Sequence, residues 1–180
     1  MEEQSGERAV VEATIQIGLD DYKAYYWYWM RRERPWWPWL MGVFLASAVL
    51  YPIWAFVSMN YTRAIYSALL FAFALYIAIS AFTRPARTYK KNRAAFDAVA
   101  VYAFFEDHLC VRISDRGSDT QVTAQYSRYL WAAETGAAFY LKTPDRNYIN
   151  LPKHCFTESQ AAALRELFAR TFGDRFKSNV

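Results

Sequence analysis

The sequence predicts an α+β membrane protein, in which a two-helix transmembrane hairpin precedes an antiparallel β domain with one C-terminal helix. Two long uncharged stretches between residues 36 and 82 predict the hairpin. Alternating apolar and polar residues, cut by turn sequences after residue 100, predict the β domain. An amphipathic repeat near the C-terminus predicts the last helix. A chain of 180 residues has room for one hairpin and one such domain.

The composition excludes several classes of protein. Hydrophobic residues make up 54 % of the chain, yet its mean hydropathy is only −0.10, so the apolar residues are concentrated in one region. Two cysteines cannot build a disulfide framework. The six glycines are too widely spaced for a P-loop, a dinucleotide-binding loop or a nucleophile elbow. A net charge of +4 is too mild to indicate a nucleic acid partner.

Residues 1–35 are expected to form an N-terminal strand and an aromatic interfacial helix. Residues 10–17 alternate as in a half-buried strand, and we expect this strand to pair with the C-terminal domain. Asp20 is expected to cap the helix, which either lies among lipid headgroups or packs on the β domain. Its aromatic side chains repeat at helical spacing, at Tyr22, Tyr25, Tyr26 and Trp29.

The membrane hairpin is predicted over residues 36–83, with helices at 36–59 and 64–82. Each uncharged stretch is long enough to cross a hydrocarbon core of about 30 Å. The join of about four residues forces the two helices to be antiparallel, with both ends on the same side. A signal peptide is not expected, because the first apolar stretch begins only at residue 36 and the N-terminus is acidic.

Basic residues predict the orientation of the hairpin. They flank it on one side, whereas the connecting loop has only Arg63, so we expect both termini in the cytoplasm. The run 84–93 either acts only as this topology determinant or also contacts anionic lipids. The residues expected at the membrane interface are Trp27, Trp29, Trp36, Trp37, Trp39, Arg84, Arg87, Lys90, Lys91 and Arg93.

Residues 84–180 are expected to form the cytoplasmic β domain, which the strand at 10–17 completes. Turn sequences at 115–118, at Thr135-Gly136 and at 143–145 separate the predicted strands. The alanine-rich segment 87–101 also has helical character, which would extend the second membrane helix. The six strands are predicted at 102–106, 109–114, 121–126, 128–134, 137–142 and 148–151.

A C-terminal helix is predicted over residues 157–172. Thr157-Glu158-Ser159-Gln160 has the pattern of a capping box, and Gly173 suits the position after the helix end. Its apolar stripe consists of Leu164, Leu167, Phe168 and Phe172. Strands in series that end in one helix favour a pleckstrin-homology-like arrangement, although other all-β folds have a similar strand count.

Several short motifs follow one another along the chain in a fixed order. They are Leu19-Asp20-Asp21-Tyr22, Tyr102-Ala103-Phe104-Phe105-Glu106-Asp107, Ala137-Ala138-Phe139-Tyr140-Leu141 and Leu151-Pro152-Lys153 with Phe156. In this order and spacing they resemble the YcxB-like family of bacterial membrane proteins. The resemblance implies a multi-pass protein of the bacterial inner membrane, and it brings no activity or catalytic residue. His154-Cys155 departs from the basic residue that is commoner there in the family.

The sequence offers few groups for chemistry. His108, Cys110, His154 and Cys155 are the only histidines and cysteines, and they would form a zinc site only if their two segments met. We expect ordinary sheet residues with reduced thiols, and neither a metal nor a cofactor. No nucleophile turn accompanies Asp107-His108, so an enzyme is not expected. The uncharged membrane stretches argue against an independent transporter.

The sequence therefore predicts a non-catalytic binding or scaffolding module that presents a β domain at the inner membrane surface. The alternative is an accessory or immunity-type subunit whose hairpin acts on another membrane protein. The expected partners are the lipid bilayer and a membrane protein or peptide, and a homo-oligomer is compatible with this interpretation. Nucleic acid is not expected, because Arg112, Arg116 and Arg128 are interspersed with acidic residues.

Overall fold

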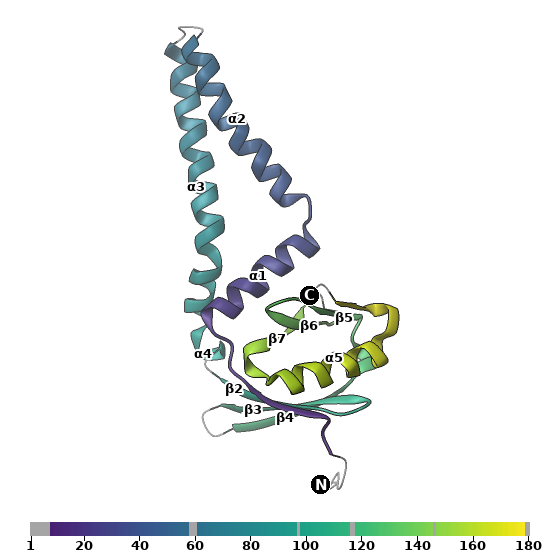
Figure 1. Ribbon diagram of the computed structural model, residues 1–180. Coiled ribbons are helices and arrows are strands. Elements are labelled where there is room, and N and C mark those ends of the chain that lie inside the picture. The colour runs from purple at the N-terminus through teal and green to yellow at the C-terminus, as the bar shows by residue number, and fades with distance from the viewer. Residues whose placement is uncertain (1–7, 58–60, 97, 116–117, 146, 179–180) are drawn as a thin grey trace. The chain divides into compact units, whose positions relative to one another are not determined.

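The chain divides into two compact units in the computed structural model (Figure 1). Unit 1 comprises Met1–Asp21 and Arg93–Val180, and unit 2 comprises Tyr22–Asn92. The structure describes residues 8–57, 61–96, 98–115, 118–145 and 147–178. The predicted α+β class, with two long apolar helices, antiparallel strands and a C-terminal helix, is confirmed.

Unit 2 is built from three helices. They are α1 (Leu19–Glu33), whose first residues belong to unit 1, α2 (Trp37–Val57) and α3 (Tyr61–Lys91). α2 agrees with the predicted stretch 36–59 over its described part. The predicted join at residues 60–63 is wrong in part, because residues 61–63 already belong to α3, while residues 58–60 lie outside the described residues. α2 and α3 separate toward the start of α2, where α1 precedes them (Figure 1).

The hydropathy pattern predicted that the second apolar helix ends at residue 82, whereas the helical character of residues 87–101 predicted an extension. The extension is confirmed as far as Lys91. α3 continues through the basic run to Lys91, although Pro85 lies inside it and lacks a backbone N–H to donate. Two residues earlier, the Thr83 hydroxyl donates a 2.8 Å hydrogen bond to the Ile79 carbonyl, a contact of the kind that supports proline-containing turns. Alanine, arginine and lysine are good helix formers, so the helix outlasts the apolar stretch.

The start of α1 corrects the predicted cap. Asp20 lies inside the first turn, and the side chain that closes the helix start is Asp21. Its Oδ2 accepts a 2.9 Å hydrogen bond from the Gly18 backbone N–H. This is the reciprocal half of a capping box, in which a carboxylate in the first turn satisfies the N–H that precedes the helix.

Unit 1 contains two four-stranded sheets. The first has the order β1 (Val11–Ile15), β2 (Val99–Phe104), β3 (His108–Asp115) and β4 (Ser118–Gln125). The second has the order β7 (Tyr148–Pro152), β6 (Ala138–Lys142), β5 (Trp131–Glu134) and β8 (Phe176–Ser178). All neighbouring strands are antiparallel except β5 and β8, which are parallel. The short helical elements are α4 (Arg93–Phe96) and the 3₁₀ turns η1 (Tyr126–Arg128), η2 (Lys153–Cys155) and η3 (Gly173–Arg175).

The N-terminal strand pairs with the C-terminal part of the chain, as its alternation predicted. β1 is antiparallel to β2, with Val11 opposite Phe104 and Ile15 opposite Ala100. It is shorter than the predicted strand at 10–17, and its residues alternate strictly between buried and exposed. The two parts of unit 1 are therefore one folded body, although the hairpin separates them in sequence.

β2 differs from its predicted bounds of 102–106. It begins at Val99 and ends at Phe104, so the segment 87–101 is helical only as far as Phe96. Ala100 lies opposite Ile15 of β1 on one side and Ile113 of β3 on the other. This central position in the sheet outweighs the helix propensity of alanine.

One further strand begins later than predicted, and one observed strand was not predicted at all. The strand predicted at 128–134 begins only at Trp131, because residues 126–128 form the 3₁₀ turn η1. β8 was not predicted, since three residues are too few to show a periodic pattern. The Thr135-Gly136 hairpin is confirmed by the β5–β6 pairing, whereas the turn predicted at 115–118 falls partly outside the described residues.

The C-terminal helix α5 (Glu158–Phe172) has the predicted stripe and caps. Thr157 and Gln160 form the reciprocal capping box, and Gly173 adopts a φ of 50° at the C-cap. Phe168 is fully buried, and its ring contacts Phe104 of the first sheet and Phe139 of the second. The helix therefore supplies the apolar contacts that join both sheets of unit 1 into one core.

Candidate functional site

The surfaces of α2 and α3 are apolar and largely exposed. Only 6 % of the stretch Trp37–Trp54 and 11 % of Ile65–Lys91 is buried, whereas the core helix of a globular protein is mostly buried. By length and composition, both helices are able to cross a membrane. Leu50, Leu69 and Phe73 are each more than half exposed. A continuous apolar surface of this kind is typical of contact with a membrane or with another protein.

Among the described side chains of residues 37–83, those that are buried are small. Ala48, Ser67 and Ala74 are each at most 1 % exposed. Small residues let two helix backbones approach closely, which is how helices pack when the surrounding medium gives no hydrophobic driving force between them. The aromatic rings of Phe44 and Phe73, 6.4 Å apart, add a contact between α2 and α3.

The predicted interface residues lie in α1, just before and in the first turn of α2, in the last turns of α3, and in α4. Trp27 and Trp29 are in α1, Trp36 precedes α2, and Trp37 and Trp39 are in its first turn. Trp36 and Trp39 are 56 % and 80 % exposed. The basic members Arg84, Arg87, Lys90 and Lys91 are in the last turns of α3, and Arg93 opens α4 in unit 1.

α1 packs against α3, a contact that the sequence interpretation did not consider. The rings of Trp27 and Phe82 are 5.4 Å apart, and those of Tyr22 and Tyr89 are 6.0 Å apart. Because α3 extends past residue 82, it offers aromatic and basic side chains to α1 beyond the apolar stretch. The sequence pattern that could have predicted this contact is the spacing of Phe82 and Tyr89, which lie two turns apart on one face of the helix.

The charged residues of unit 2 are almost all basic. Within Tyr22–Asn92 the only acidic residue is Glu33, against the basic residues Lys23, Arg31, Arg32, Arg34, Arg63, Arg84, Arg87, Lys90 and Lys91. Within the described part of the chain, Arg31, Arg84, Arg87, Lys90 and Lys91 have no carboxylate partner. Arg34 instead lies over the Trp29 ring, 5.9 Å from its centroid. The charges of Arg31, Arg84, Arg87, Lys90 and Lys91 are therefore not neutralised by a carboxylate of the described residues.

A cleft of about 510 Å³ lies among the three helices of unit 2. Its size falls in the range of about 300–1,000 Å³ that is usual for small-molecule sites. Arg31 is the one charged residue among those that line it. The other lining residues are Tyr26, Trp27 and Met30 of α1, Trp37, Pro38, Met41, Gly42 and Leu45 of α2, and Ala78, Ala81 and Phe82 of α3.

The two histidines and two cysteines do not form the zinc site that the sequence allowed as a possibility. His108 stacks on Phe105 and contacts Asp107, and the Cys110 thiol accepts a 3.1 Å hydrogen bond from Gln121. The hydrogen bond between His108 and the Asp107 carboxyl lowers the pKa of that carboxyl. Among the residues that the structure describes, no group of three or more histidine, cysteine or acidic side chains could hold a metal ion.

His154 and Cys155 instead lie beside the first turn of α1. His154 Nε2 is 2.9 Å from Asp21 Oδ1, and its Nδ1 is 3.5 Å from the Cys155 thiol. Burial raises the pKa of the Cys155 thiol, which keeps it protonated and a poor nucleophile at neutral pH. Asn150 donates a 3.3 Å hydrogen bond to the Asp21 carbonyl. These contacts join Asp21, a residue of unit 1, to β7 and η2.

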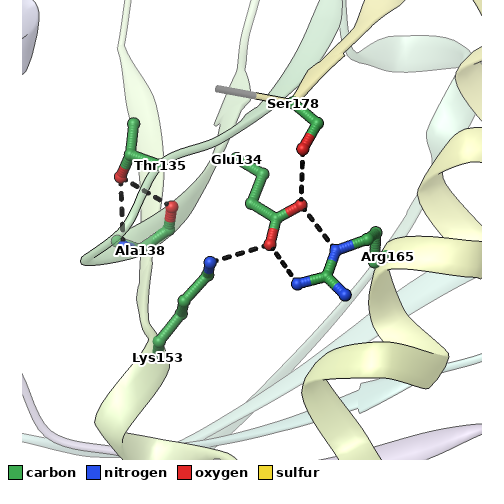
Figure 2. Close-up of polar contacts among 6 residues, drawn as sticks. All are labelled: Glu134, Thr135, Ala138, Lys153, Arg165 and Ser178. Atoms are coloured by element: carbon green, nitrogen blue, oxygen red, sulfur yellow. Dashed lines mark hydrogen bonds and ion pairs between the residues drawn. The ribbon is translucent and has the colours of Figure 1, made fainter. Parts of the chain in front are cut away.

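A buried carboxylate in unit 1 was missed by sequence reasoning (Figure 2). Glu134, at the end of β5, is completely buried and accepts hydrogen bonds from Arg165 of α5 at 2.6 and 2.8 Å. Lys153 and Ser178 lie 2.7 and 3.0 Å from the same carboxylate. Burial alone would raise its pKa, but these donors lower it to about 2. An acidic residue on the buried face of an apolar strand was the signal available in the sequence.

The outer face of the first sheet carries a shallow hollow of about 310 Å³. Its polar lining consists of Glu12 of β1, Cys110 and Arg112 of β3, and Gln121 of β4, beside the aromatic ring of Phe105. Both charge signs and an amide meet here on a sheet face that α5 does not cover. Such a mixed surface offers both donors and acceptors to a polypeptide.

No family model, curated protein or solved structure matches this chain. The resemblance to YcxB-like proteins and the pleckstrin-homology-like arrangement therefore stay predictions from the sequence motifs and the strand order.

Proposed function

We propose that the chain is a membrane-anchored binding or scaffolding module without catalytic activity. In this proposal α2 and α3 span the bacterial inner membrane as a hairpin, and both termini are cytoplasmic. Unit 1 then offers its sheets to a protein or peptide partner at the membrane surface. The observation that carries the proposal is the exposed apolar surface of α2 and α3, because contact of this surface with water is unfavourable.

The distribution of charge supports the orientation. The basic residues of unit 2 other than Arg63 lie in α1, in the segment after it or in the last turns of α3. Both of these regions are at the same end of an antiparallel hairpin. Basic residues beside short loops are retained in the cytoplasm, and each contributes about 1 kcal/mol near an anionic surface.

The hollow on the first sheet supports a binding role for unit 1. Glu12, Arg112 and Gln121 are exposed and provide one anion, one cation and one amide side by side. A peptide laid across this face could satisfy all three groups, whereas a nucleic acid would be repelled by Glu12.

The test is partner capture from membranes of a bacterial host that makes the full chain. Photo-crosslinking is followed by mass spectrometry for the wild type, for Arg112→Glu and for a chain with an unrelated two-helix anchor. Arg128→Glu serves as the matched control, because Arg128 is exposed in η1 outside the hollow. We expect Arg112→Glu to lose the partner and both other variants to keep it.

The opposite pattern would support the accessory-subunit alternative. In that case the anchor exchange removes the partner and Arg112→Glu retains it. Turnover of any substrate by the purified full chain would contradict the non-catalytic proposal itself.

A further inference from the structure

The cleft in unit 2 combines an apolar wall with one cation. Arg31 lines it and has no carboxylate partner within the described part of the chain. The remaining wall is aromatic and aliphatic, and Met30 within it is only 8 % exposed. An arginine that faces an apolar cavity is complementary to a molecule with an anionic head and an apolar tail.

Small residues keep the cleft open. Gly42 of α2 and Ala78 and Ala81 of α3 lie opposite the aromatic side chains of α1. A Cβ atom added at Gly42 would meet no other atom within 4 Å, so the space beside it is unoccupied by protein. The Trp27–Phe82 contact, with ring centroids 5.4 Å apart, forms part of the aromatic wall.

The walls of the cleft also indicate the source of its ligand. Leu45, Ala78 and Ala81 belong to the same apolar stretches that are able to cross a membrane. If these stretches span the bilayer, the cleft opens to lipid near the basic end of the hairpin. A bilayer lipid then reaches it without passing through water, whereas a soluble amphiphile has to partition first.

We propose that this cleft seats an acyl chain of one anionic phospholipid from the bilayer, with Arg31 at the lipid phosphate. This inference rests on the proposed membrane anchoring of α2 and α3. It goes beyond that proposal because it assigns one lipid site, its headgroup charge and the residue that recognises it. The arginine donates charge-assisted hydrogen bonds to the phosphate, and the apolar wall takes the chain out of contact with water.

The test measures lipid retained by the full chain after extraction from nanodiscs that contain equal amounts of phosphatidylglycerol and phosphatidylcholine. Native mass spectrometry identifies the bound molecule by its mass. We expect one retained phosphatidylglycerol per chain, and about a fivefold lower ratio of phosphatidylglycerol to phosphatidylcholine in Arg31→Gln. Arg128→Gln is the matched control, because Arg128 is exposed in η1 of unit 1 and does not line the cleft.

A second pair of variants tests the cavity itself. Ala81→Phe fills the cleft and should abolish retention of both lipids, whereas Ala72→Phe, on an exposed position of α3 outside the cleft, should leave retention unchanged. Equal retention in Ala81→Phe and Ala72→Phe, or a retained fatty acid in place of a phospholipid, would overturn the inference. Alkaline extraction of the same membranes separates the two proposals. A chain that resists extraction but retains no lipid refutes only the lipid site, whereas a chain that is extracted refutes the anchoring as well.

Discussion

The two units use the same kinds of side chain in opposite ways. Unit 1 buries its large aromatic residues completely, as with Phe104, Phe139 and Phe168. Unit 2 leaves Phe82 and Trp39 at least 70 % exposed. Unit 1 therefore has an interior of its own, whereas the apolar residues of α2 and α3 lie largely on the surface of unit 2. Composition alone does not distinguish a unit with a buried interior from a unit with an exposed apolar surface. The arrangement of the residues in the structure does.

Charge shows the same contrast. The buried Glu134 of unit 1 is surrounded by donors from three other elements. The cations of unit 2 that line the end of α3 have no such carboxylate among the described residues. Unit 1 thus pairs its buried carboxylate with its own donors, whereas Arg84, Arg87, Lys90 and Lys91 of unit 2 are exposed.

The largest effect on this contrast should come from removing β1. Deletion of residues 1–18 takes Val11, Ala13 and Ile15 out of the core and exposes the edge of β2. Burial of the two larger side chains alone stabilises a fold by roughly 3–6 kcal/mol. We expect a corresponding fall in Tm, measured by near-ultraviolet circular dichroism of the full chain in detergent micelles.

The control for this deletion removes residues 1–7 only and keeps the whole of β1. Its Tm should match that of the wild type. If the longer deletion left the Tm equally unchanged, the pairing of β1 with β2 would not contribute to the stability of unit 1.

A smaller loss is expected from Glu134→Ala. It leaves Arg165 and the mostly buried Lys153 without their shared carboxylate, and loss of one partner of a buried ion pair costs about 3–5 kcal/mol. Glu106→Ala is the control, because its ion pair with Arg170 is exposed on both sides and should change stability by at most about 1 kcal/mol. Chemical denaturation measures both free energies of unfolding.

The same carboxylate predicts a pH dependence. The pKa of Glu134 is about 2 in the folded chain and 4.5 without the fold, so its contribution is complete above pH 4.5. Stability falls as the pH drops from about 4.5 to about 2, because the unfolded chain binds this proton first. The loss amounts to about 3 kcal/mol. Glu134→Ala should remove this part of the acid sensitivity, and an unchanged pH profile would contradict the assignment.

A change of similar size acts on unit 2 alone. Leu69→Lys places a charge on an exposed apolar position of α3, which costs about 2.5–3.5 kcal/mol for insertion into a membrane. We expect a lower fraction of the chain in the membrane pellet after alkaline extraction, with Leu69→Ala as the control. In a protein that does not enter a membrane, a lysine at this exposed position would be harmless or would raise solubility.

The parts of the fold that depend on periodicity could be predicted from the sequence. The stripe and caps of α5 and the alternation of β1 are local patterns with one physical explanation each. The helical character of residues 87–101 indicated that α3 extends beyond residue 82. The exact end of α3 and the start of β2 could not be predicted, because neither is set by local hydropathy. α3 extends because good helix formers follow the apolar stretch, and β2 begins early because strands lie on both of its sides.

The candidate sites were predictable to a lesser extent. The tryptophans and basic residues at the hairpin ends stand out by residue type, so their positions on α1, α2 and α3 follow from the sequence. The cleft requires α1 to pack against α3 through Trp27 and Phe82, residues that are 5.4 Å apart in space and far apart in sequence. The Glu134 cluster likewise joins residues from β5, η2, α5 and β8, which no local pattern connects.

The most direct test of membrane anchoring is a pair of reporter fusions in a bacterial host. An enzyme that is active only outside the cytoplasm is fused after Val57, at the end of α2, and separately after Val180. We predict activity for the fusion after Val57 and none for the fusion after Val180, with both chains resisting alkaline extraction. Activity after Val180, or extraction of both chains into the soluble fraction, would contradict a hairpin with cytoplasmic termini.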